Sequence, residues 1–346
     1  MRRLTVLILA LILLLPAARA EELPYPRDTV LSVLELTGTQ QALTAYLYPF
    51  ILQGTTRIDL PRGTLYDDAA AAVRSLTQDY PELFHLEKMY SIGYYQDEPE
   101  YAVWLQLRYT VPAEEADSMR RSMLNAAQQL LSDGPAPDLI HDRLCEGVVY
   151  NHGAPYCSTA YGALMEGEAS CEGYAQALTL LFRMSGIPCG MITGTAVDAW
   201  GYPEAHSWNI ARLQGCTLID ATWNDQSHLG LNTHWYYGLS TDQMGADHFP
   251  DAGQRIPDCG EQDNWHARRS LIISSQAQAD AAIGVLIREG SVSLRITDAA
   301  LYAAIAHDTA AFLEDYNQRH PQEPFLGAYS IIHSDPQQCL VLQRAE

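Results

Sequence analysis

Residues 171–188 read CEGYAQALTLLFRMSGIP, and they decide how the middle of the chain folds. Apolar side chains recur at helical spacing through this stretch, and Gly186 and Pro188 end the pattern. The pattern predicts a helix that begins at Cys171, with Ser170 as its N-cap. A thiol is therefore expected at the start of a helix.

Cys171 would lie where a helix favours negative charge. The unpaired backbone N–H groups of the first turn and the positive end of the helix dipole both stabilise a thiolate, which is the nucleophilic form. The same N–H groups can hold the oxyanion of a tetrahedral intermediate. Gly173 would keep this turn narrow, so that a peptide could approach it closely.

The sequence after the helix predicts a strand over 190–196 and a hairpin made of strands 205–213 and 216–222. His206 begins the first strand of the hairpin, and Asp220 lies near the end of the second. An imidazole can take a thiol proton and return it to a leaving amine. A carboxylate can hold that imidazole in one tautomer.

The residue types alone leave two interpretations of Cys171, His206 and Asp220. In the first they form a catalytic triad, and changing Asp220 to Asn should lower the rate greatly with little change in stability. In the second Cys171 is a structural cysteine, His206 is a hydrogen-bonded core residue and Asp220 is a turn carboxylate.

The turn of the hairpin decides whether His206 and Asp220 can meet. A two-residue turn at 214–215 would put their side chains on opposite faces, because side chains alternate along a strand. A three-residue loop over 213–215 puts them on one face as diagonal neighbours within reach of each other. We predict that loop, or an equivalent bulge, with Gly215 in the left-handed region.

Four motifs carry a family resemblance: Cys-Glu-Gly-Tyr-Ala at 171–175, Gly-Ile-Pro at 186–188, His-Ser-Trp-Asn at 206–209 and Asp-Ala-Thr-Trp-Asn-Asp at 220–225. Together they closely resemble the transglutaminase-like superfamily of papain-related folds, in particular its bacterial exported members. The resemblance covers about residues 138–249. It implies a triad of Cys171, His206 and Asp220, and an α+β core in which the helix with the cysteine packs on an antiparallel sheet.

The resemblance implies acyl transfer at the carbonyl of a peptide amide or protein glutamine. The reaction would pass through a thioester on Cys171 that water or an amine resolves. The superfamily includes Gln–Lys crosslinkers, peptidases, amide-hydrolysing members and inactive binding versions. The alternative function is therefore a non-catalytic binding or surface-interaction protein that keeps the same scaffold. No cofactor is expected for either function.

Several residues beside the motifs have two interpretations. Trp208 and Trp223 flank the histidine and the aspartate, and they either pack in the core or contact the substrate, so both are candidate substrate-binding residues. Asn209 and Asn224 are expected in surface turns. No metal site is expected, because the remaining histidines of this region lack ligand spacing: they are His228, His234, His248 and His266.

The composition limits the partners. The chain has 346 residues and a net charge of −21, and Lys88 is its only lysine. An acidic surface repels phosphate backbones, so nucleic-acid binding is not expected. The expected partner is a protein or peptide substrate, including one attached to a cell wall or surface.

The first twenty residues have the pattern of an export signal. Arg2 and Arg3 precede an apolar stretch over 4–15, and Ala18-Arg19-Ala20 fits the cleavage rule. A signal peptide over 1–20 predicts a secreted or cell-surface protein, with no integral membrane segment after cleavage. The seven cysteines are an odd number, which leaves at least one thiol free or in an intermolecular bond; their pairing is not readable from the sequence.

The rest of the chain divides at a run of turn residues over 133–137. Together with the signal, this predicts four regions: the signal peptide at 1–20, an N-terminal α/β region at 21–135, the transglutaminase-like core at 136–266 and a small α/β domain at 267–346. In the flanking regions the patterns predict helices at 40–52, 64–77, 113–131, 277–288 and 299–316, a hairpin of 89–95 with 101–109, and strands at 271–273, 291–296, 329–333 and 339–343.

Overall fold

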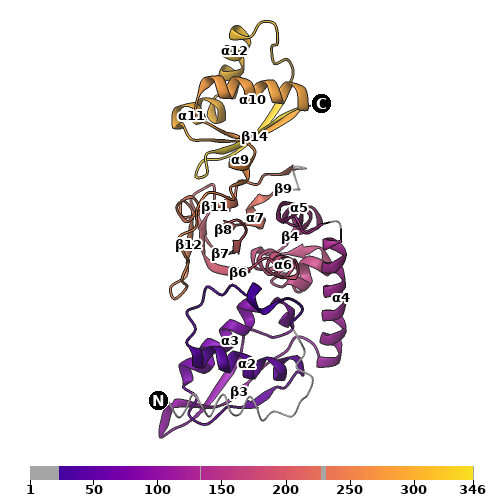
Figure 1. Cartoon of the computed structure of the whole chain (residues 1–346), viewed down its shortest axis with the longest axis vertical. Coiled ribbons are helices and arrows are strands. Elements are labelled where there is room, and N and C mark those ends of the chain that lie inside the picture. Colours follow the sequence, from indigo (N-terminus) through magenta and orange to yellow (C-terminus); the bar gives the residue numbers. More distant parts are fainter. Residues whose placement is uncertain (1–22, 133, 227–230, 346) are drawn as a thin grey trace. The chain divides into compact units, whose positions relative to one another are not determined.

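The computed structural model describes residues 23–132, 134–226 and 231–345. The expected signal peptide over 1–20 and His228 lie outside these residues. Figure 1 shows the helices and strands of the chain coloured along the sequence. By their contacts they form two compact units. Among the described residues, the first comprises 23–132, 134–193, 207–212 and 251–256, and the second comprises 194–206, 213–226, 231–250 and 257–345.

The first part of the first unit consists of two helices on a three-stranded sheet. Helices α2 (Gly38–Leu52) and α3 (Tyr66–Asp79) pack together, and α3 also packs on the sheet of order β1-β3-β2. Its strands are β1 (Arg57–Asp59), β3 (Glu98–Gln106) and β2 (Ser91–Tyr95). Helix α3 buries residues at helical spacing, which explains its formation: they include Ala69, Ala72, Val73 and Leu76.

The second part of the first unit is built around α6 (Cys171–Met184), the helix predicted from the opening stretch. Helices α4 (Ala113–Leu131) and α5 (Pro137–Gly147) pack against it. Gly186 follows α6 with a φ of 78°, which suits glycine at the end of a helix. The short elements of this unit are η1 (Arg27–Thr29), η2 (Pro81–Leu83), β4 (Val149–Tyr150), η3 (Gly162–Glu166) and β5 (Glu168–Ala169).

Strands β6 (Cys189–Val197) and β7 (Pro203–Arg212) belong partly to each unit. They occupy the middle of a five-stranded sheet of order β11-β8-β7-β6-β12. The other strands are β8 (Cys216–Ile219), β11 (Tyr237–Leu239) and β12 (His248–Pro250). The smaller elements of this region are α7 (Ala221–Asn224), β9 (Asp225–Gln226), β10 (Leu231–Asn232), α8 (Thr241–Met244) and α9 (Trp265–Arg268).

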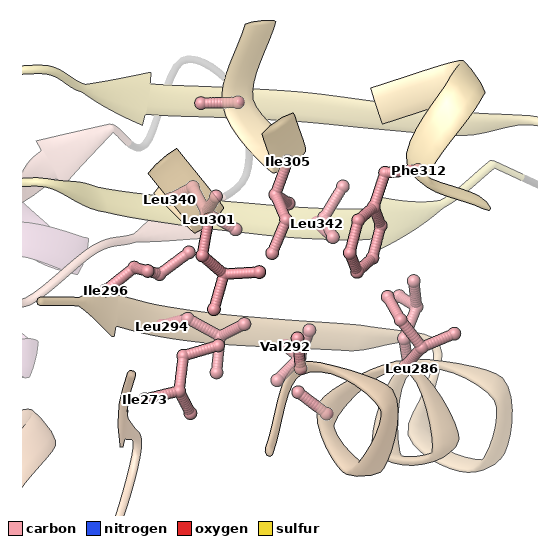
Figure 2. Packing of buried hydrophobic residues seen from close by; sticks show 14 of the residues in the cluster. Ile273, Leu286, Val292, Leu294, Ile296, Leu301, Ile305, Phe312, Leu340 and Leu342 are labelled. Atoms are coloured by element: carbon pink, nitrogen blue, oxygen red, sulfur yellow. The ribbon is translucent and has the colours of Figure 1, made fainter. Parts of the chain in front are cut away.

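The last part of the second unit is a four-stranded sheet with three helices. The sheet has the order β13-β14-β16-β15, and the elements are β13 (Ile272–Ile273), α10 (Gln276–Glu289), β14 (Ser291–Ile296), α11 (Ala299–His307), α12 (Thr309–Arg319), β15 (Tyr329–Ser334) and β16 (Cys339–Arg344). Figure 2 shows apolar side chains of β14 and β16 meeting those of the helices, among them Leu294, Leu342, Ile305 and Phe312. Residues at alternate positions of β14 therefore supply one face of a separate apolar core.

The predicted helix at 113–131 is confirmed at both ends by α4. The predicted helix at 299–316 is wrong as a single element, because the chain forms α11 and α12 with a break at Asp308. Asp308 has φ −142° and ψ 49°, and Asp favours helix boundaries over helix interiors. Within the ranges that the structure covers, we find no helix long and apolar enough to cross a membrane.

Candidate active site

Cys171 is the first residue of α6, as predicted, and its side chain is half-buried. Ser170 occupies the N-cap position with extended backbone, but its hydroxyl does not cap the helix. It donates instead to the carbonyl of Cys157, at 3.2 Å. The Ser170 side chain therefore does not cap the first turn, at whose start Cys171 lies.

Gly173 is needed for a different reason from the predicted one. A Cβ at this position would lie 2.1 Å from the carbonyl oxygen of Cys157. The same oxygen accepts a hydrogen bond from the backbone N–H of Ser170, at 2.8 Å. The space that we assigned to an approaching peptide is thus filled by the backbone of Cys157, which supports the start of α6.

A cavity of about 630 Å³ lies beside the first turn of α6 in the first unit. Glu172 and Gln176 of α6 line it, and Glu172 forms an ion pair of 2.5 Å with Lys88. Phe84 and Tyr156 contribute aromatic walls, and their rings lie 6.3 Å apart. A mostly apolar cavity therefore lies next to the helix that carries Cys171.

His206 and Asp220 meet in the second unit. The Nε2 atom of His206 lies 2.8 Å from Oδ2 of Asp220, and the two residues are 5% and 1% exposed. The predicted strand over 216–222 is too long, because β8 ends at Ile219 and Asp220 begins the helical turn α7. Asp220 Oδ1 accepts the backbone N–H groups of Thr222 at 2.9 Å and Trp223 at 3.2 Å, so the same carboxylate caps α7.

The three-residue loop over 213–215 is present between β7 and β8, as predicted. Gly215 is not in the left-handed region, so that part of the prediction is wrong. The backbone N–H groups of Gln214 and Gly215 donate to the Asp263 carboxylate, at 3.2 and 3.0 Å. A Cβ on Gly215 would lie 1.6 Å from Nε2 of Gln262, at the far end of a flexible side chain, so a larger residue here would only require that side chain to move.

The sequence interpretation missed His248 and Asp247. The Nε2 atom of His248 lies 3.1 Å from the same Asp220 Oδ2, and its Nδ1 atom lies 2.6 Å from Asp247 Oδ1. His248 and Asp247 are each 1% exposed. His248 starts β12, which pairs with β6, so only the sheet brings it to Asp220. The single signal in the sequence was the adjacent Asp-His pair.

Burial and charge act in opposite directions on these groups. Burial alone would raise the pKa of Asp220, but His206 and His248 hold the pKa of this carboxyl well below its usual range. Burial alone would lower the pKa of His248, yet its hydrogen bonds and charge attraction to Asp220 and Asp247 raise it above the usual value. The arrangement therefore favours an ionised Asp220 beside a protonated His248.

Aromatic rings enclose the buried pair. The Trp223 ring centroid lies 5.1 Å from that of His206, 4.6 Å from that of His248 and 5.2 Å from that of Tyr236. Trp223 also lines a cavity of about 620 Å³ in the second unit, together with the exposed Trp200. Trp208, in contrast, is 1% exposed, so the substrate contact considered for it is corrected to core packing.

The predicted surface positions of Asn209 and Asn224 are wrong, because both side chains are fully buried. Asn209 Nδ2 donates to the carbonyl of Ala175 in α6, at 2.9 Å. Asn224 Oδ1 accepts the backbone N–H of Tyr236, at 2.8 Å. Each buried amide thus has a backbone hydrogen-bond partner inside the fold.

Two groups of side chains in the second unit bring three potential metal-ligand atoms close together. In the first, His206, Asp220 and His248, both imidazoles already face one carboxylate oxygen at hydrogen-bond distance, which is the arrangement of a hydrogen-bonded network. The second is exposed, and there His307 Nε2 and His333 Nδ1 lie 3.1 and 3.0 Å from Oδ1 of Asp335.

The sequence profile of the transglutaminase-like superfamily matches residues 123–223, a range that includes Cys171, His206 and Asp220. The match supports the resemblance of this core to the transglutaminase-like superfamily. Together with its mixed helices and sheets, the match confirms the predicted α+β, papain-like class of the core. The superfamily is in general one of cysteine-dependent catalysts.

The chain is similar to several solved structures, but with low sequence identity and low TM-scores. A proposed cysteine protease from Cytophaga hutchinsonii has 17% identity and a TM-score of 0.26, and the match covers 42% of this chain and 64% of that one. The periplasmic domain of TgpA from Pseudomonas aeruginosa, bound to ethylmercury, has 16% identity and a TM-score of 0.24, over 38% and 59% of the two chains. A TGase has 13% identity and a TM-score of 0.25, over 48% and 50%. The chain thus spans less than two thirds of each of these proteins, and no curated protein matches it by sequence.

Proposed function

We propose that the chain is a cysteine-dependent enzyme of acyl transfer at an amide carbonyl, in a peptide or a protein glutamine. The observation that carries this proposal is the buried His206–Asp220 contact of 2.8 Å, together with Cys171 at the start of α6. Both features lie within the matched transglutaminase-like core. A thiol nucleophile needs an imidazole as its base, and a buried carboxylate can hold that imidazole in place.

The proposed reaction has two stages. The Cys171 thiolate attacks the amide carbonyl carbon, and the backbone N–H groups at the start of α6 hold the oxyanion. Since Nε2 of His206 faces Asp220, proton transfer runs through the other ring nitrogen, Nδ1. Nδ1 takes the thiol proton of Cys171 as the thiolate forms and gives it to the leaving amine as the C–N bond breaks. Water or an acceptor amine then gives a proton to His206 and attacks the thioester, and the thiolate leaves.

This proposal is tested by incubating the protein with a glutamine peptide, either in water alone or with a primary amine, and measuring the ammonia released. Cys171→Ala and His206→Ala should each abolish ammonia release, because one removes the nucleophile and the other the base. The matched control is Cys157→Ala, since Cys157 is also a half-buried free cysteine of the first unit. Undiminished turnover in Cys171→Ala would overturn the enzyme assignment.

The alternative, a non-catalytic binding protein on this scaffold, makes an opposite prediction for the thiols. In an enzyme, iodoacetamide should modify Cys171 much faster than Cys157, and the difference should shrink in His206→Ala, where only the start of α6 still stabilises the thiolate. Equal rates for the two thiols, with no turnover by the unmodified protein, would favour the binding function.

We also propose that the protein is exported, with 1–20 as the signal and Glu21 as the first mature residue. The basic start, the apolar stretch and Ala18-Arg19-Ala20 support this proposal. N-terminal sequencing of the protein recovered outside the cytoplasm should begin at Glu21. An intact Met1 on membrane-bound protein would show that the segment is an anchor.

A further inference from the structure

Asp220 has both carboxylate oxygens occupied. Oδ1 accepts two backbone N–H groups at the start of α7, while Oδ2 faces Nε2 of His206 and Nε2 of His248, at 2.8 and 3.1 Å. His248 therefore competes with His206 for the same oxygen. The support that Asp220 gives to His206 depends on the state of His248.

The geometry around His248 favours a cation. Its two ring nitrogens each face a carboxylate oxygen, Asp247 at 2.6 Å and Asp220 at 3.1 Å. A neutral imidazole has one N–H group, so one contact would set a nitrogen lone pair against a carboxylate oxygen, whereas an imidazolium donates at both nitrogens. The raised pKa of His248 agrees with this reading of the distances.

Asp247 is itself held in place from three sides. Its Oδ2 atom accepts the Tyr236 hydroxyl at 2.8 Å, and Gln337 Nε2 lies 3.4 Å from both carboxylate oxygens. The titratable groups in contact with His248 include Asp220 after β8, Asp247 before β12, His206 on β7 and Tyr236 before β11. The side chain of His248 is completely enclosed.

We propose that His248, held by Asp247, is a positioning residue of this site: as a cation it shares the Asp220 carboxylate with His206, orienting Asp220 and limiting how strongly it retains a proton on His206. This inference rests on the proposed function. During turnover His206 must both accept and release a proton. If the buried carboxylate interacted with His206 alone, it would raise the pKa of this imidazole further. His206 would then hold its proton too strongly to give it to a leaving amine.

The test compares the pH dependence of kcat/KM for the unchanged protein, His248→Gln, Asp247→Asn and the double variant. A positive charge lowers the pKa of neighbouring groups, so its loss should move both limbs of the profile to higher pH, by about one unit or more. Asp247→Asn should shift the limbs in the same direction, because His248 then loses the anion that keeps it protonated. The double variant should shift no further than His248→Gln, since both changes remove one cation.

His266→Gln is the matched control. His266 is a fully buried histidine of the same unit, with its Nε2 atom 3.0 Å from Ser293 Oγ, and it lies outside the network. Its substitution should lower stability without moving either limb of the profile. Folded His248→Gln and Asp247→Asn proteins with unshifted limbs would overturn the inference.

A second measurement is independent of turnover. Nitrogen-15 NMR of the unchanged protein at pH 7, with the His248 signals assigned by their loss in His248→Gln, should show both ring nitrogens protonated. A neutral His248 would overturn the inference even in an active enzyme. Protonated His248 in a protein that hydrolyses or transfers no amide would instead refute the proposed function and leave the charge network in place.

Discussion

Asp220 combines two structural tasks in one side chain. Its Oδ1 atom caps α7, and its Oδ2 atom receives two imidazoles, while the residue is only 1% exposed. A buried carboxylate survives without water only when hydrogen bonds and opposite charge replace its hydration. The hydrogen bonds of the fold therefore hold Asp220 in place, independently of any role in catalysis.

Asp220→Asn should lower turnover by about 10⁴-fold, because the amide favours the wrong tautomer of His206. The structure changes the expectation of unaltered stability, since His206 and His248 would lose their buried counter-ion. Breaking such a buried pair costs about 3 to 5 kcal/mol. Steady-state kinetics and urea unfolding of the same preparation measure both effects. An unchanged rate would mean that another group orients His206.

His248 gives the stability a defined pH dependence. Its pKa is raised from the usual 6.5 on folding, so its contacts contribute fully below that value and are lost as the pH rises through the folded pKa. The difference in unfolding free energy between the unchanged protein and His248→Gln should therefore be largest in mildly acidic solution and shrink at alkaline pH. Urea unfolding across this range measures it, and a difference that grew with pH would contradict a protonated His248.

At the scale of elements, the local sequence predicts those features that depend on the spacing of neighbouring residues. The start of α6 at Cys171 and the loop over 213–215 followed from apolar periodicity and strand alternation. The physical reason for Gly173 did not, because this glycine faces a backbone atom from elsewhere in the chain, the Cys157 carbonyl oxygen, and the Gln262 side chain beside Gly215 was not expected either. Such close approaches leave no periodic trace in a sequence.

Gly173→Ala should displace the start of α6 and therefore the thiol. The added Cβ would lie 2.1 Å from the Cys157 carbonyl oxygen, so backbone has to move, at a cost of about 1 to 3 kcal/mol. Turnover should fall with the stability, because catalysis is sensitive to small displacements of a nucleophile. Gly147→Ala in α5 is the control, since its Cβ would meet nothing within 4 Å. Equal midpoints of thermal unfolding for the two variants would show that the Cys157 contact does not support α6.

At the scale of the whole molecule, long-range pairing accounts for what the sequence did not predict. His248 reaches Asp220 only because β12 pairs with β6. The small α/β domain predicted at 267–346 also contributes, since Gln337 contacts Asp247 and Ser334 contacts Tyr236. Arg295 of β14 also donates to the carbonyl of Trp235, at 2.9 Å. The second unit therefore holds His206 and Asp220 through contacts that no local pattern contains.

The disulfide between Cys216 and Cys259 joins two cysteines 43 residues apart in the sequence, one of them at the start of β8. Closing a loop of this length stabilises a protein by about 2 to 4 kcal/mol, largely by restricting the unfolded chain. Such bonds persist in oxidising compartments, which agrees with the proposed export.

The double change of Cys216 and Cys259 to Ser should lower the free energy of unfolding by about 2 to 4 kcal/mol, because it removes this bond. A reductant should destabilise the unchanged protein equally and leave the double variant unaffected. Cys157→Ser is the control, because its thiol is free. If the unchanged protein and the double variant unfolded at the same urea concentration, with and without reductant, the disulfide would contribute nothing to the stability of the second unit.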